Sequence, residues 1–183
     1  MNIFLVGFMG AGKSYIGRKL ALVLDRPFAD LDVWIETTTG KTIKTIFEEE
    51  GEDSFRNLEA IHLRKSKNHK HLVLATGGGT PCFHNNMEWM LSQGRVVFLD
   101  PPIGTLLSRL EGERAHRPLL AQNEDATEEN SRADLHRPPS LAFAESVSRR
   151  LAERRPIYEN AHLIVDGDND EQDILRLIQK SLQ

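Results

Sequence analysis

The sequence predicts an α/β protein in which a parallel sheet of five strands lies between two layers of helices. The first observation is an alternation along the 183 residues: short apolar runs are separated by segments with apolar residues at helical spacing. The second is that these runs are apolar throughout, which is typical of strands buried on both faces of a parallel sheet. The third is that glycine-rich loops directly follow two of the runs, which favours binding sites at the carboxyl ends of the strands.

Each element follows from this pattern. The apolar runs predict strands at 3–6, 27–32, 72–75, 95–99 and 163–165. Helical spacing and capping signals predict helices at 15–24, 33–39, 42–51, 52–66, 86–93, 103–110 and 170–182. Gly40 is expected to end the second helix and Thr42 to cap the third. Glycine tolerates the left-handed backbone of a helix end, and a threonine hydroxyl accepts a hydrogen bond from a free N–H group.

The loop after the first strand fits the pattern G-x-x-x-x-G-K-[ST] at every defined position, in Gly7-Phe8-Met9-Gly10-Ala11-Gly12-Lys13-Ser14. It lies between a predicted strand and a predicted helix, as a phosphate-cradling loop requires. Its backbone N–H groups would point at phosphate oxygens, Lys13 would reach the terminal phosphates, and Ser14 would hold Mg²⁺ directly. An ordinary glycine-rich turn is the alternative. The predicted nucleoside triphosphate site consists of Gly10, Ala11, Gly12, Lys13, Ser14 and Tyr15.

Two carboxylates, Asp30 and Asp32, stand where the second strand is expected to end beside the phosphate loop. If the strand continues to Asp32, both side chains project from the same face. One would then support magnesium through water, while the other would accept a hydrogen bond from a substrate hydroxyl and orient it for attack. A solvated pair of aspartates, or Asp32 as the cap of the next helix, is the alternative.

Gly77, Gly78 and Gly79 directly follow the third strand. Backbone N–H groups in such a run can approach a ligand with no side chain in the way, although a plain turn is also compatible with it. Arg56 lies in the segment Phe55-Arg56-Asn57-Leu58-Glu59 and, taken alone, fits a surface helix.

Taken together, these pieces resemble the shikimate kinases, small enzymes of the nucleoside-monophosphate-kinase type of fold. The matching segments run in family order over nearly the whole chain. They are the loop at 7–14, Asp30-Leu31-Asp32 with Ile35-Glu36, Ile46-Phe47, Gly51-Glu52 through Phe55-Arg56 and Glu59, Gly77-Gly78-Gly79, Arg117-Pro118-Leu119-Leu120, and Arg154-Arg155-Pro156-Ile157-Tyr158. The resemblance implies one three-layer α/β/α P-loop kinase domain over residues 1–183, with shikimate-binding helices at 33–66 and a mobile lid at 112–155.

The resemblance also implies a reaction, the Mg²⁺-dependent transfer of the γ-phosphoryl group of ATP to the 3-hydroxyl of shikimate on the route to chorismate and the aromatic amino acids. By position, Asp32 matches the residue that binds the shikimate hydroxyls and is expected to act as base, and Asp30 lies near the magnesium. Lys13, Asp32 and the lid arginine Arg117 are the implied catalytic residues, and Arg117 is also expected to contact ATP. The residues implied to bind shikimate are Asp32, Arg56, Gly77, Gly78, Gly79, Arg154 and the apolar walls Phe47 and Phe55.

Two features depart from the family pattern. The segment between Arg117 and Arg154 is longer than the usual lid, and the surplus is a polar run at 122–139 that predicts a mobile extension or a plain disordered loop. The extra length leaves open which arginine meets the substrate, although the Pro-Ile-Tyr sequence that follows favours Arg154 over its neighbours Arg149, Arg150 and Arg155. The loop at 166–170 is acidic where relatives often offer a basic contact to adenine.

Composition limits the partners and the location. A net charge of -4 and a pI near 6.0 give no electrostatic case for nucleic acid, and the longest apolar runs are too short to span a bilayer. The single cysteine, Cys82, excludes an internal disulfide, and the chain starts with a core strand, so we expect a cytoplasmic protein. The sequence contains no apolar repeat of the kind that would favour an obligate assembly, and a monomer is expected.

Two other functions remain open on the sequence. A kinase of another small hydroxy acid, such as gluconate, would share the phosphate loop and the lid, but it would not need Arg56 and the triple glycine in this arrangement. A relative that has lost catalysis would serve as a nucleotide-dependent regulatory module. Against that second function, Lys13, Asp32 and Arg154 are all present.

Overall fold

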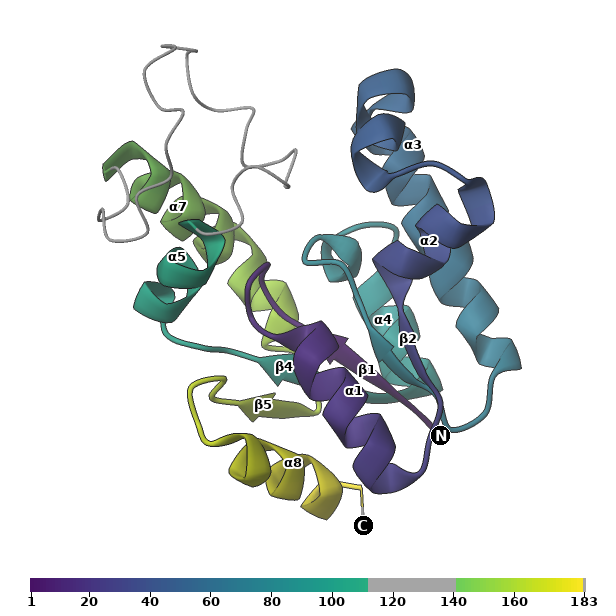
Figure 1. Ribbon diagram of the computed structural model, residues 1–183, viewed down its shortest axis with the longest axis vertical. Helices are drawn as coiled ribbons and strands as arrows, with labels where there is room; N and C mark the ends of the chain where they lie inside the picture. The colour runs from purple at the N-terminus through teal and green to yellow at the C-terminus, as the bar shows by residue number, and fades with distance from the viewer. Residues whose placement is uncertain (112–140, 183) are drawn as a thin grey trace.

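The computed structural model describes residues 1–111 and 141–182 and confirms the predicted α/β class (Figure 1). Its strands form one parallel sheet in the order β2-β3-β1-β4-β5, so the first strand lies at the centre. All five predicted strands are present, and the second is shorter than expected. The strands are β1 (Asn2–Val6), β2 (Phe28–Asp30), β3 (Val73–Ala75), β4 (Gly94–Leu99) and β5 (Leu163–Val165).

The predicted helices are also confirmed, to within two residues at their ends. Gly40 ends the second helix in a left-handed conformation, and the Thr42 hydroxyl accepts a hydrogen bond from the Thr45 N–H at the start of the third. The two helices predicted on either side of Gly51 form one element with a kink at that residue. The helices are α1 (Lys13–Leu24), α2 (Leu31–Thr39), α3 (Ile43–Lys65), α4 (Asn86–Gln93), α5 (Ile103–Glu111), α7 (Leu141–Tyr158) and α8 (Glu171–Lys180), with short 3-10 turns η1 (Ser66–Asn68) and η2 (Thr80–Cys82).

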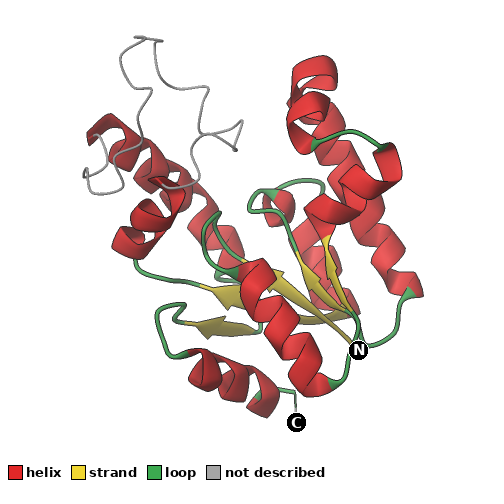
Figure 2. Ribbon diagram, viewed as in Figure 1, coloured by secondary structure: helices red, strands yellow, loops and turns green. Residues whose placement is uncertain are grey.

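Helices cover both faces of the sheet, as Figure 2 shows. On one face α1 lies so close to the strands that a methyl group on Gly17 would sit 2.6 Å from the Phe28 ring, and α8 packs beside α1. On the opposite face, Trp89 of α4 meets Phe4 edge-on with ring centroids 5.9 Å apart. The Tyr158 ring of α7 lies 5.1 Å from the Phe98 ring. Successive strand residues therefore point into two separate apolar layers.

Helix α7 was not predicted. The family resemblance placed residues 141–155 in a lid and no helix was expected there, but Phe143, Val147 and Leu151 recur every fourth residue and are all buried. That spacing is the signal of a helix face packed on the core. Pro156 stands in the last turn, where it removes one backbone hydrogen bond without ending the helix.

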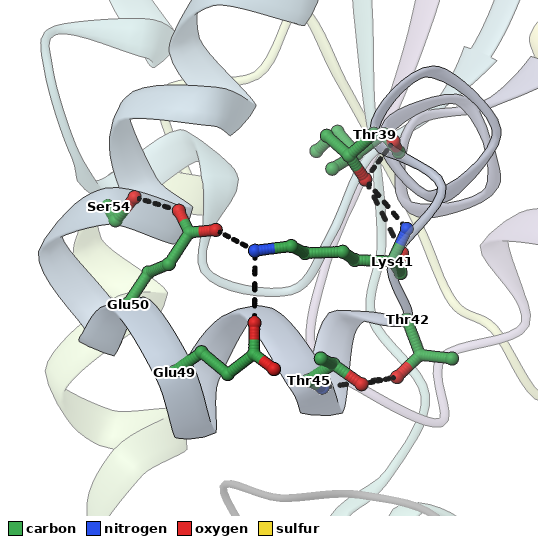
Figure 3. A network of polar contacts seen from close by, with 8 residues as sticks. Thr39, Lys41, Thr42, Thr45, Glu49, Glu50 and Ser54 are labelled. Carbon is green, nitrogen blue, oxygen red and sulfur yellow. Dashed lines mark hydrogen bonds and ion pairs between the residues drawn. The ribbon is translucent and has the colours of Figure 1, made fainter.

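The pair formed by α2 and α3 extends beyond the carboxyl edge of the sheet and is tied together at its connecting turn (Figure 3). The Lys41 ammonium lies 2.6 Å from a Glu50 carboxylate oxygen and 3.0 Å from one of Glu49, and Ser54 donates to the other oxygen of Glu50. These contacts raise the pKa of Lys41 and lower the pKa of Glu50. Because Ser54 follows the kink at Gly51 and the glutamates precede it, the network links both parts of α3 to the turn.

Helix length and composition also bear on membrane insertion. Across residues 1–111 and 141–182, every helix is too short or too polar to cross a bilayer.

Candidate active site

A cavity of about 620 Å³ runs along the carboxyl ends of the strands. Its floor is the loop after β1, and its walls come from the start of α2, the segment after β3 and the loop that leads into α8. Two groups of residues predicted separately from the sequence, the phosphate loop and the pair Asp30 and Asp32, line this one cavity together with Gly77 and Gly78.

The phosphate loop is shaped by left-handed glycines. Gly10 and Gly12 have φ angles of 78° and 87°, and Gly12 directly precedes α1. Such angles let the loop turn so that its N–H groups and the helix N-terminus face the cavity. The ammonium of Lys13 is buried against the loop and donates to the carbonyl oxygens of Gly7 at 2.9 Å and Phe8 at 2.8 Å. The cationic group is thus fixed where phosphates would arrive.

Asp30 and Asp32 are both at the cavity, but the geometric reason given for them is wrong. Strand β2 ends at Asp30, and Asp32 lies in the first turn of α2, so the two do not share a strand face. The carboxylate of Asp30, and not that of Asp32, caps α2 by accepting from the N–H groups of Asp32 and Val33. Asp32 instead faces the segment after β3, where a methyl group on Gly77 would sit 3.0 Å from its Oδ1.

Oxygen donors suited to magnesium meet at one edge of the cavity. The Ser14 hydroxyl donates to the Asp30 carboxylate, which brings the two predicted magnesium residues into direct contact. Mg²⁺ favours such hard oxygen ligands and usually keeps several waters and phosphate oxygens. Among the described residues there is no group of three or more His, Cys, Asp or Glu that could hold a metal ion. The residues present fit the ion.

Arg56 is only 3% exposed, so its interpretation as a surface helix residue is wrong. Its Nη1 donates to Glu59 at 2.6 Å, and its Nε and Nη2 donate to Glu52 at 3.0 and 2.7 Å. The guanidinium also lies 4.4 Å from the centre of the Phe83 ring. Phe55 adds a second aromatic contact at 5.2 Å. Phe47 packs on Phe55 with ring centroids 4.7 Å apart, as expected for an apolar wall.

Glu59 is a functional candidate that the sequence analysis did not assign. Its carboxylate is fully buried between Arg56 and the hydroxyl of Thr80, which donates to it. Burial raises the pKa of Glu59, and the nearby Arg56 cation opposes that rise. Glu59 follows Arg56 by three residues, a spacing at which opposite charges meet on a helix. This spacing was the signal in the sequence that could have identified Glu59 as the partner of Arg56.

The three glycines after β3 each make a different close approach. A methyl group on Gly77 would lie 2.6 Å from the Glu59 carboxylate, and one on Gly79 would lie 2.6 Å from the Arg56 guanidinium. A methyl group on Gly78 would meet the backbone nitrogen of Met9 in the phosphate loop at 3.0 Å. The triple glycine therefore allows the acceptor side and the phosphate loop to pack against one strand end.

Helix α7 brings two neighbouring arginines to different surroundings. Arg155 forms a two-pronged ion pair with Asp100, at 2.6 and 2.8 Å. Arg154 lies over the ring of Phe8 at 5.8 Å, and its buried Nη1 has no hydrogen-bond partner among the described residues. A buried donor without an acceptor costs free energy, so an anionic ligand at this point would be stabilising. This contrast favours Arg154 over Arg155 as a ligand contact.

Tyr158 connects the same helix to the glycine run. Its hydroxyl donates to the carbonyl oxygen of Gly78, and burial raises its pKa. The bond fixes the Gly78 peptide group beside the cavity. The predicted lid residue Arg117 and the polar run at 122–139 lie outside the described residues.

The far end of the cavity holds residues that the sequence analysis missed. Arg109 of α5 donates to the carbonyl oxygen of Gly10 at 3.1 Å and lies 3.9 Å from Asp168. The acidic loop before α8 is thus partly balanced by a cation from another helix. Glu171 lines the same end, and the predicted residue Tyr15 donates to it. A single arginine or glutamate within a helix carries no local signal of such a role.

Comparison with known proteins identifies relatives over the whole chain. The family model described as shikimate kinase matches residues 9–183. A shikimate kinase of Phocaeicola vulgatus is 38% identical over 181 residues, covering 99% of this chain and 94% of the relative. A crystal structure of shikimate kinase from Bacteroides thetaiotaomicron has a TM-score of 0.83 at 34% identity, covering 100% of this chain and 98% of that one. The Acinetobacter baumannii shikimate kinase in complex with shikimate also has a TM-score of 0.83, at 36% identity, covering 99% and 92% of the two chains.

A gluconokinase structure from Sinorhizobium meliloti covers 99% of this chain and 90% of that one, but with a TM-score of 0.53 and 15% identity. That similarity shows the shared fold alone.

Proposed function

The chain belongs to the shikimate kinase family, and we propose that it transfers the γ-phosphoryl group of ATP to the 3-hydroxyl of shikimate, giving shikimate 3-phosphate and ADP. The observation that supports this most directly is the shared cavity, in which a phosphate loop lies beside Asp32, Gly77 and Gly78. Phosphoryl transfer requires mainly that the two reactants be held in line and that charge be neutralised.

The acceptor would be held by its carboxylate at one end and by its hydroxyls at the other. Arg154 supplies a buried nitrogen without a partner, and Arg56 supplies a guanidinium already fixed by two glutamates. The N–H of Gly78 would add a backbone donor, since Tyr158 fixes that peptide group. Guanidinium groups suit this role because their planar fork matches a carboxylate. Asp32 would bind the hydroxyls and accept the proton of the attacking one.

The phosphates would lie on the loop from Gly10 to Ser14. Lys13 is fixed at the loop by two carbonyl oxygens and would neutralise charge that develops on the transferred group. Ser14 directly and Asp30 through water would hold magnesium, which would offset the negative charge of the phosphates. Tyr15 would contact the nucleotide next to this loop. Arg117, which lies outside the described residues, remains a predicted phosphate contact.

We further propose that the protein is a cytoplasmic monomer with a single kinase domain, whose lid comprises residues 112–155. The single cysteine, which allows no internal disulfide, supports the cytoplasmic location. Closure of a lid would exclude water from the γ-phosphate and so limit ATP hydrolysis.

The test is ADP release with Mg²⁺ and ATP in the presence of shikimate, gluconate or no acceptor, with the product identified by ³¹P NMR. We expect shikimate alone to stimulate release. Asp32→Asn should lower kcat by about 10² to 10⁴ while ATP binding is retained. Asp53→Asn, an exposed change of the same kind on α3, should leave both unchanged. ATP binding without release on any acceptor would favour the regulatory module, and stimulation by gluconate would favour the other kinase.

A further inference from the structure

The order of the strands fixes the direction in which a nucleotide lies in the cavity. Asp32 and Gly77 lie beyond β2 and β3 at one edge of the sheet, the phosphate loop lies beyond the central β1, and Glu171 lies beyond β5 at the opposite edge. Under the proposed function, on which this inference rests, the acceptor hydroxyl at Asp32 attacks the terminal phosphate. The phosphate chain must then point toward β3 and the nucleoside toward β5.

Glu171 places a carboxylate at this nucleoside end. One of its oxygens accepts a hydrogen bond from the Tyr15 hydroxyl at 2.5 Å, and the other lies 3.5 Å from the Lys19 ammonium. A carboxylate has about four lone-pair sites, so these two contacts leave acceptor capacity toward the cavity. The groups of a nucleotide that suit it are the ribose hydroxyls, which are donors, whereas phosphate oxygens are acceptors that a carboxylate repels.

Tyr15 positions this carboxylate relative to the phosphates. Tyr15 follows Ser14 directly on α1. The helix therefore holds the Cα and Cβ atoms of Tyr15 beside the last residue of the loop that would bind the phosphates. Its hydroxyl connects α1 to Glu171 on α8, which holds the carboxylate before a nucleotide binds and reduces the ordering that binding would require. Lys19 offsets the charge of Glu171 and so reduces the repulsion of an anionic nucleotide.

We propose that Glu171, positioned by Tyr15, accepts hydrogen bonds from the ribose hydroxyls of the bound nucleotide and makes the site discriminate against 2′-deoxy and 3′-deoxy nucleotides.

The experiment is titration calorimetry of the full chain with ADP, 2′-deoxy-ADP and 3′-deoxy-ADP in Mg²⁺, without shikimate. The wild type should bind ADP about tenfold or more tightly than at least one deoxy analogue, because a hydrogen bond to a charged group is lost. Glu171→Ala should reduce this ratio to below about twofold. Asp173→Ala is the matched control. It removes the same charge from the same turn of α8, but Asp173 is exposed and pairs with Arg176.

Tyr15→Phe tests the positioning role. The variant keeps the ring and should reduce the discrimination by about threefold, and it should have no further effect in a Glu171→Ala background. Equal affinity of the wild type for all three nucleotides, or full discrimination in Glu171→Ala, would overturn the inference. Turnover with shikimate is measured in parallel. Intact turnover without ribose discrimination overturns only the ribose inference, and intact discrimination without turnover on shikimate overturns only the proposed function.

Discussion

The two halves of the candidate site, one for phosphate and one for the acceptor, are built by different means. The phosphate half is made mostly of backbone: its loop is turned by glycines, and its one buried cation, Lys13, is held by carbonyl oxygens of the same loop. The acceptor half adds side chains that lie outside the lining of the cavity, with Arg56 and Glu59 buried together beside η2 and Arg154 carried by α7. Backbone geometry is encoded in one contiguous stretch, whereas the acceptor half depends on charges from several distant elements. The acceptor half should therefore be the more sensitive to loss of a single side chain.

The largest effect is expected for the buried ion pair. Glu59→Ala leaves the Arg56 cation and the Thr80 hydroxyl without their shared acceptor, which should lower the free energy of unfolding by about 3 to 5 kcal/mol. Glu52 also contacts Arg56 but is 46% exposed, so Glu52→Ala should cost less than about 1 kcal/mol. Urea unfolding at fixed pH measures both. Equal losses would mean that burial does not distinguish the two glutamates.

The next largest effect is expected from substitution of one of two neighbouring arginines on α7. Arg154→Ala should raise the KM for shikimate by about 10- to 100-fold, because a charge-assisted hydrogen bond to the substrate is lost. The KM for ATP should change much less. Arg155→Ala breaks the partly exposed pair with Asp100 and should leave both KM values nearly unchanged. If Arg155→Ala raised the KM for shikimate more than Arg154→Ala, the assignment of the carboxylate contact would be reversed.

Substitutions at two adjacent glycines should affect the two halves of the site differently. Gly79→Ala pushes on the Arg56 guanidinium and should mainly raise the KM for shikimate, whereas Gly78→Ala pushes on the backbone of Met9 and should also raise the KM for ATP. If the overpacking cost of about 1 to 3 kcal/mol falls on substrate binding, the affected KM should rise by about 5- to 150-fold. Steady-state kinetics with each substrate varied in turn makes the comparison. The same KM pattern in both variants would contradict this division.

The smallest effect is expected far from the cavity, at the turn between α2 and α3. Lys41→Met removes an exposed ammonium from Glu49 and Glu50 and should lower Tm slightly at low salt. The difference should disappear at high salt because exposed pairs are screened, and kcat should not change. Differential scanning calorimetry at low and high salt measures this difference in Tm. A decrease in Tm that persists at high salt would show that packing of the lysine stem matters more than its charge.

The same division explains what the sequence could predict. The strands and the phosphate loop follow from local patterns, and their order along the chain was enough to predict the sheet. The alternative that Asp32 caps the next helix named the wrong aspartate. Two carboxylates two residues apart can compete for the same N–H groups, and only the end of β2 decides between them. Arg109 and Glu171 could not be found, because each comes to the cavity through the packing of a whole helix.

One consequence follows from the continuity of the cavity. The acceptor and nucleotide ends share a single space along the carboxyl ends of the strands, with the phosphate loop between them. A molecule that joins an adenosine to a carboxylate-bearing ring by a linker of the right length would engage both ends at once, and its second contact would form at a high effective concentration. Its affinity should then exceed that of either half by far more than their contact areas suggest, and a linker too short to pass over the loop should lose the entire gain.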